Sequence, residues 1–146
     1  MKFSVPLSLL ILAMVIPFVA VLAPRSMSLP VQATAAGSVQ SATLFAATEQ
    51  TERGKAVFGM ICAKCHGEQG QGGNGPRLIG SPNGLSGYGT ARGLFDFAST
   101  QMPFDDPGSL KAEQYWDALA FILDANNLLP PDTILGPENA ADIKLK

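Results

Sequence analysis

The chain has 146 residues, which suits one domain of ordinary size, and a formal net charge of −2 from 10 Lys and Arg against 12 Asp and Glu. This near-neutral balance excludes the basic face that a nucleic-acid-binding protein presents to phosphate. Apolar residues make up 47% of the chain but crowd the N-terminus, with 18 in residues 1–23 and only 39 in residues 47–146. The last hundred residues therefore hold a small apolar core for their length.

The N-terminal segment, residues 1–23, is an apolar run with Lys2 near its start. Its uncharged part, residues 5–23, approaches the ~20 residues that span a bilayer, yet a secretory signal has a similar pattern. We expect either an uncleaved membrane anchor, forming an apolar helix, or a signal peptide cleaved after Ala35. Either segment exports the rest of the chain. Residues 24–46 have no charge after Arg25 and no clear period, which predicts a flexible linker.

A helix is expected over residues 49–61, with Thr48 as its N-cap and acidic residues in its first turn. Gly54 and Phe58 lie four residues apart and therefore share one face of this helix.

The only two cysteines and the only histidine of the chain fall within residues 62–66, as Cys62-Ala63-Lys64-Cys65-His66. This C-x-x-C-H spacing is typical of covalent haem attachment, in which both cysteines form thioethers and the histidine binds the iron. The alternatives fit less well. Zinc needs four ligands, a thioredoxin-like dithiol needs a βαβ unit, and a Cys62–Cys65 disulfide leaves the histidine unexplained.

Ten of the 15 glycines lie in residues 67–93, which predicts a long loop that approaches the haem closely. A short helix is expected over residues 91–100, ending before Pro103. Met102 follows this helix and is the one methionine downstream of the C-x-x-C-H motif. We expect Met102 to be the sixth iron ligand, with a lysine or an open position as the alternative.

The last predicted helix covers residues 111–125, with Trp116, Leu119 and Leu123 on its apolar face. Its N-cap is either Lys111, with Gln114 at the third position, or Ser109. Residues 130–146 form an extension that begins with Pro130-Pro131, which end the helix. This extension is too apolar for a solvated tail. We interpret it as a strap packed along the domain surface or as a docking segment for a partner subunit.

These motifs, in the order in which they occur along residues 47–129, resemble those of class I c-type cytochromes. The resemblance implies an all-α cytochrome c fold, with three to five helices around one covalently attached haem c. It also implies that the first helix crosses the last at Gly54, against Phe121. In the segment Gly-Pro-Arg-Leu-Ile-Gly, it implies that the Pro76 carbonyl accepts a hydrogen bond from His66 and that Leu78 packs on the haem.

The function expected from these features is one-electron transfer by a haem with His66 and Met102 as axial ligands, on the periplasmic or extracytoplasmic side of the membrane. No substrate is transformed, so the chain is not expected to be an enzyme on its own. Residues 47–129 hold six basic and nine acidic residues, which argues against steering toward a strongly acidic redox partner. The alternative is a haem subunit of a larger membrane-associated oxidoreductase, a quinoprotein dehydrogenase or a quinol-oxidising complex.

Overall fold

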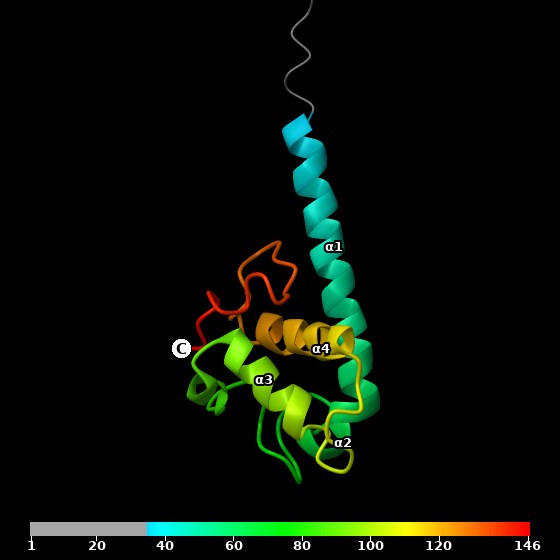
Figure 1. Ribbon diagram of the computed structural model, residues 1–146, viewed down its shortest axis with the longest axis vertical. Coiled ribbons are helices and arrows are strands. Elements are labelled where there is room, and N and C mark those ends of the chain that lie inside the picture. The colour runs from blue at the N-terminus through cyan, green and yellow to red at the C-terminus, as the bar shows by residue number, and fades with distance from the viewer. Residues whose placement is uncertain (1–34) are drawn as a thin grey trace, which may run out of the picture. The chain divides into compact units, whose positions relative to one another are not determined.

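The computed structural model describes residues 35–146, so the predicted anchor or signal peptide and residues 24–34 of the predicted linker lie outside the described residues. The described chain is helical, as predicted (Figure 1). Its elements are α1 (Ala35–Val57), a π-helical turn η1 (Phe58–Cys62), α2 (Ala63–His66), a 3-10 turn η2 (Leu85–Tyr88), α3 (Ala91–Gln101) and α4 (Ala112–Ala125). Among residues 35–146, no helix is both long and apolar enough to cross a membrane.

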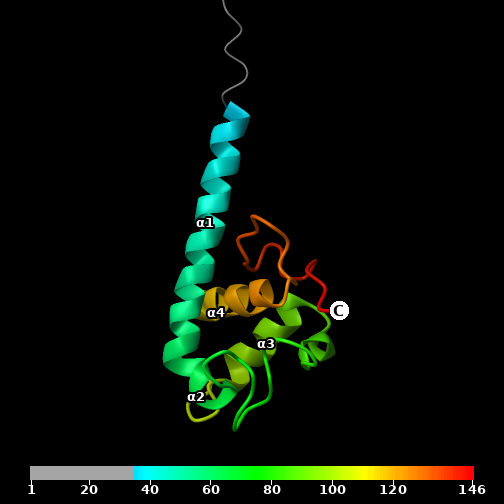
Figure 2. The same cartoon turned by 180° about the vertical axis from the view of Figure 1, so that it is seen from behind.

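The first helix begins earlier than predicted, because residues 35–46 are helical rather than an irregular linker. Thr48 is not an N-cap; its hydroxyl donates to the carbonyl of Leu44, at 2.9 Å, inside the helix. The first half of α1 extends beyond the rest of the described chain (Figures 1 and 2), and Val39 and Phe45 are each 65% exposed. A helix segment without a buried face shows no apolar period, which is why the sequence did not predict residues 35–46 as helix.

Helices α1 and α4 cross at Gly54, as the resemblance implied. A Cβ atom on Gly54 would overlap the backbone carbonyl oxygen of Asp117 and lie 3.0 Å from Cβ of Phe121. One turn further along, the rings of Phe58 and Phe121 pack with their centroids 5.4 Å apart. The crossing is therefore close enough that only a glycine fits at this position of α1.

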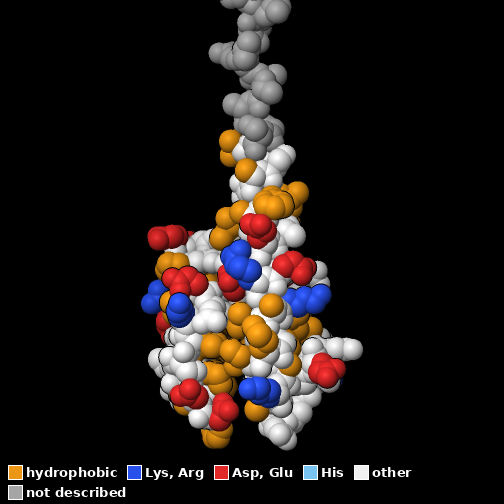
Figure 3. All heavy atoms as spheres, turned by 90° about the vertical axis from the view of Figure 1, so that its right-hand side faces the viewer, with side chains coloured by type: hydrophobic (Ala, Val, Ile, Leu, Met, Phe, Trp, Pro, Cys, Tyr) orange, Lys and Arg blue, Asp and Glu red, His pale blue; other side chains and the backbone are white. Residues whose placement is uncertain are grey.

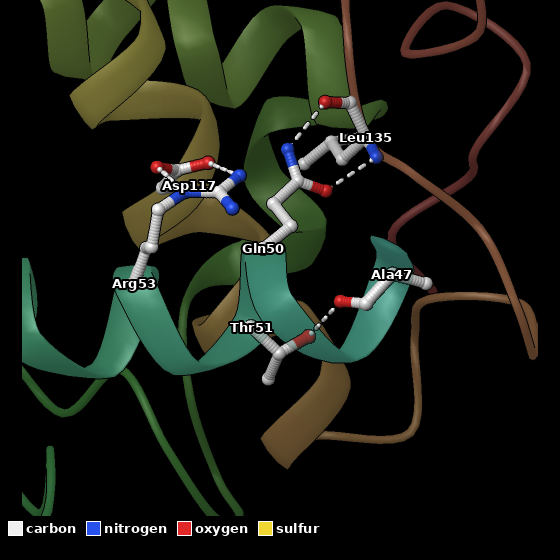
Figure 4. Close-up of polar contacts among 6 residues, drawn as sticks. All are labelled: Ala47, Gln50, Thr51, Arg53, Asp117 and Leu135. Atoms are coloured by element: carbon white, nitrogen blue, oxygen red, sulfur yellow. Dashed lines mark hydrogen bonds and ion pairs between the residues drawn. The ribbon is translucent and has the colours of Figure 1, made fainter. Parts of the chain in front are cut away.

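An ion pair fixes the same crossing from the solvent side. The Arg53 guanidinium donates to both carboxylate oxygens of Asp117, from Nε at 2.9 Å and from a terminal nitrogen at 3.2 Å (Figure 4). These hydrogen bonds raise the pKa of Arg53 above its usual value. Since a paired Arg–carboxylate fork has a defined geometry, it sets the register of α1 on α4.

The C-terminal strap, residues 130–146, is part of the core, and its contacts are those of a packed strap. The side chains of Leu135, Ile143 and Leu145 are buried. The buried Gln50 side chain of α1 makes two 2.8 Å hydrogen bonds to the backbone of Leu135, one to the carbonyl and one from the N–H (Figure 4). The strap therefore contributes buried apolar side chains to the same small core as the helices.

The strap also supplies partners for the start of α3. The backbone N–H groups of Ala91 and Arg92 donate to the carbonyls of Ile143 and Ala140, at 2.9 and 3.0 Å. The first N–H groups of a helix have no partner within the helix. The helix that ends at Met102 is thus anchored at its other end by residues far along the chain.

The first half of α1, residues 35–46, contains no charged residue. On the face that Figure 3 shows, charged side chains gather around the second half of this helix. The exposed apolar residues on this first half, Val39, Leu44 and Phe45, lie on different sides of the helix, so α1 has no single amphipathic stripe there.

Candidate functional site

The Cys62–His66 segment continues directly from α1 through the π-helical turn η1 into the short helix α2. Cys62 and Cys65 are three residues apart on helical backbone, so their side chains project to the same side. Both thiols are free, Cys62 half-buried and Cys65 exposed. Burial raises the pKa of the Cys62 thiol to about 11, so this thiol is protonated at neutral pH.

The imidazole of His66 is buried and held by the glycine-rich loop. Its Nδ1 lies 2.7 Å from the carbonyl oxygen of Pro76, as the resemblance implied. Because a carbonyl only accepts hydrogen bonds, Nδ1 must carry the proton, and Nε2 then carries a lone pair. No hydrogen bond within residues 35–146 reaches Nε2, so this nitrogen is the one available to a metal ion.

Glycines bring the loop close enough to hold the ring. The Gly75 N–H donates to the Cys65 carbonyl at 2.8 Å, and the Gly72 N–H donates to the His66 carbonyl at 2.7 Å. A Cβ atom on Gly75 would come within 2.8 Å of Cε1 of the imidazole. The glycine excess of this segment therefore allows backbone to pack directly against His66.

Met102, the expected sixth ligand, lies at the C-terminal end of α3, in a different part of the fold from residues 62–66. Helix α3 covers Ala91–Gln101, almost as predicted, with Thr90 as its N-cap, and Met102 has extended backbone because Pro103 follows. Its carbonyl accepts hydrogen bonds from the Tyr115 hydroxyl at 2.6 Å and from the Gly108 N–H at 3.1 Å. The side chain is half-buried, so it retains surface for a ligand.

Aromatic residues join α3, which carries Met102 at its end, to α4. The rings of Phe95 and Trp116 stack with centroids 3.7 Å apart and an interplanar angle of 7°. Tyr115 meets the same Phe95 ring edge-on, at 6.3 Å. Such contacts fix α3 against α4, and with it the position of Met102.

Asn126 is a site residue that sequence reasoning missed. From the end of α4, its side-chain nitrogen donates to the Leu78 carbonyl at 2.9 Å, and its side-chain oxygen accepts from the Gly80 N–H at 3.0 Å. It therefore secures the loop segment that includes Leu78. An Asn after a helix is a recognisable stop signal, but nothing in the sequence connects it to partners more than 40 residues away.

The residues present fit a haem. Apolar side chains on the segments that hold His66 pack against the core while remaining partly exposed, which suits the face of a porphyrin; they are Cys62, Ala63, Leu78 and Ile79. Two thiols and one oriented imidazole lie within five residues of sequence. Among the described residues, no group of three His, Cys, Asp or Glu side chains is placed to hold a bare metal ion. The donor set therefore suits a haem better than a zinc ion.

The helical fold and this donor set define a c-type cytochrome domain. Residues 49–122 match the family model described as "Cytochrome C oxidase, cbb3-type, subunit III". This match covers half of the chain, and the chain belongs to that family. No curated protein matches the chain.

A solved structure has a similar fold. The crystal structure of the sulfane dehydrogenase SoxCD from Paracoccus pantotrophus contains a chain that is 27% identical, with a TM-score of 0.56. The similarity covers 65% of the present chain and 52% of the SoxCD chain. The present chain thus matches about half the length of its solved relative.

Proposed function

We propose that the chain is a one-electron carrier with a single haem c, attached through Cys62 and Cys65 and ligated by His66 and Met102. The observation that carries this proposal is the 2.7 Å hydrogen bond between His66 Nδ1 and the Pro76 carbonyl, beside two free thiols. When bound, haem supplies the Fe(III)/Fe(II) couple. A second candidate function, discussed below, places the same chemistry within a larger complex.

The protein residues orient and tune this group. Pro76 fixes the ring orientation of His66 and makes the imidazole a stronger donor, because its carbonyl takes the Nδ1 proton in a hydrogen bond. The Met102 thioether favours the reduced state and so raises the redox potential. If His66 and Met102 both held the iron, no substrate would reach the metal, and the chain would act as an electron-transfer module rather than an enzyme.

We propose an extracytoplasmic location, with residues 1–23 as a signal peptide or a membrane anchor. The apolar composition of that segment and the covalent haem motif support it. Residues 47–129 hold more acidic than basic residues, nine against six, which favours a redox partner without a strongly acidic docking face.

Covalent attachment is tested by replacing Cys62 and Cys65 with alanine, singly and together. We expect the parent protein to keep its haem through denaturing electrophoresis and acid–acetone extraction. The double variant is expected to lose all haem under these conditions, because only the thioether bonds survive denaturation. Haem that can be extracted from the denatured parent protein would contradict covalent attachment.

The second candidate function is a haem subunit of a larger oxidoreductase. The match to a chain of the SoxCD dehydrogenase covers 52% of that chain. This similarity favours the candidate. Purification from membranes in mild detergent distinguishes the two functions. A stable complex with a second polypeptide supports a subunit, and a monomer cleaved near Ala35 supports a free carrier.

A further inference from the structure

Tyr115, in the first turn of α4, connects two helices at the proposed site. It is only 5% exposed, and its hydroxyl donates a 2.6 Å hydrogen bond to the backbone carbonyl of Met102. Met102 directly follows α3, as its C-cap, whereas Tyr115 belongs to α4. The bond thus ties the proposed sixth ligand to a helix that does not carry it.

Among the described residues, the Tyr115 hydroxyl is the hydrogen-bond partner of Met102 that lies outside α3 and the loop after it. The Met102 N–H donates to Ala98, and its carbonyl also accepts from Gly108, at the end of the turn that follows. The other hydrogen bonds of residues 102–109 found within the described chain stay inside α3 and this loop. The loop itself is open to solvent, with Phe104 83% exposed. Without Tyr115, Met102 is therefore held by local contacts alone.

The donor is itself well ordered. Gln114 accepts the Lys111 N–H at 3.0 Å and caps α4, and the Tyr115 N–H donates to the Lys111 carbonyl at 3.3 Å. Phe95 packs edge-on against the Tyr115 ring. The hydroxyl is thus fixed before it meets the carbonyl, so little entropy is lost when the bond forms.

We propose that Tyr115 is a positioning residue that holds Met102 on the iron and keeps external ligands out. This inference rests on the proposed function, since it takes Met102 as the sixth ligand. For Met102 to leave the iron, its segment must move, and the bond from Tyr115 resists that movement. Removing the hydroxyl therefore raises the fraction of protein in which the methionine is detached.

The test uses the full-length holoprotein and the Tyr115→Phe variant, titrated with imidazole in the oxidised state. The readout is the far-red sulfur-to-iron charge-transfer band, which reports methionine ligation. We expect the variant to keep the band without imidazole but to lose it at a roughly fivefold lower imidazole concentration, the factor that one hydrogen bond typically supplies.

Tyr88→Phe is the matched control, because within the described residues the Tyr88 hydroxyl makes no hydrogen bond and its ring packs on Phe97. This variant is expected to titrate like the parent protein. Equal imidazole affinity in the Tyr115→Phe variant and the parent would overturn the positioning role while leaving Met102 ligation intact. A parent protein without the charge-transfer band would instead overturn Met102 ligation itself.

Discussion

Replacing Gly54 with alanine is expected to destabilise the holoprotein by about 3 kcal/mol or more, at the upper end of the cost of overpacking a core. The added methyl group would overlap the Asp117 carbonyl and press on Cβ of Phe121. Both obstacles belong to the α4 backbone or to an atom fixed to it, so the two helices must separate. The helix-propensity gain of ~1 kcal/mol from alanine offsets only part of this cost.

Gly59→Ala provides the matched control for this prediction. Gly59 lies five residues along the same helical stretch, and a Cβ atom there meets nothing within 4 Å. We expect this variant to be as stable as the parent protein, or more stable by up to ~1 kcal/mol. Denaturant unfolding of both variants measures the difference. Equal stabilities for Gly54→Ala and Gly59→Ala would contradict the close crossing of α1 and α4.

Ending the chain at Leu129 is expected to abolish cooperative folding. The deletion removes the buried side chains of Leu135, Ile143 and Leu145. At ~1.5–3 kcal/mol for each buried side chain, their loss costs roughly 5–9 kcal/mol, comparable with the ~5–15 kcal/mol that stabilises a whole domain. It also leaves the Gln50 amide and the first N–H groups of α3 without their partners.

The control for this deletion is a chain ending at Leu145, which lacks only the exposed Lys146. It is expected to unfold at the same denaturant concentration as the full chain. Far-UV circular dichroism followed through a denaturant titration measures both. A truncated chain that still unfolds in one sharp transition near the parent midpoint would show that the strap is dispensable.

Local signals in the sequence predicted much of the second half of the fold. Helix α4 spans Ala112–Ala125 against a predicted range of 111–125, because its apolar stripe and its Lys111 cap are both local. The His66–Pro76 contact was implied by the family resemblance. Both predictions, helix α4 and the His66–Pro76 contact, depend on residues that lie close together in the sequence or within a short motif.

Long-range polar contacts could not be predicted in the same way. Gln50 pairs with Leu135 across 85 residues, and Asn126 holds the Leu78 segment across 48. Neither residue type signals a particular distant partner. The extent of α1 was missed for a different reason: residues 35–46 form helix without the buried face that produces an apolar period in the sequence.

The measurement that tests the central claim most directly is the absorption spectrum of the full-length holoprotein and of its Met102→Ala variant, with and without carbon monoxide. With His66 and Met102 both on the iron, the oxidised parent shows the sulfur-to-iron charge-transfer band, and the reduced parent does not bind carbon monoxide at neutral pH. Met102→Ala loses the band and binds carbon monoxide. A parent protein that binds carbon monoxide, or a variant with an unchanged spectrum, contradicts the proposed ligation.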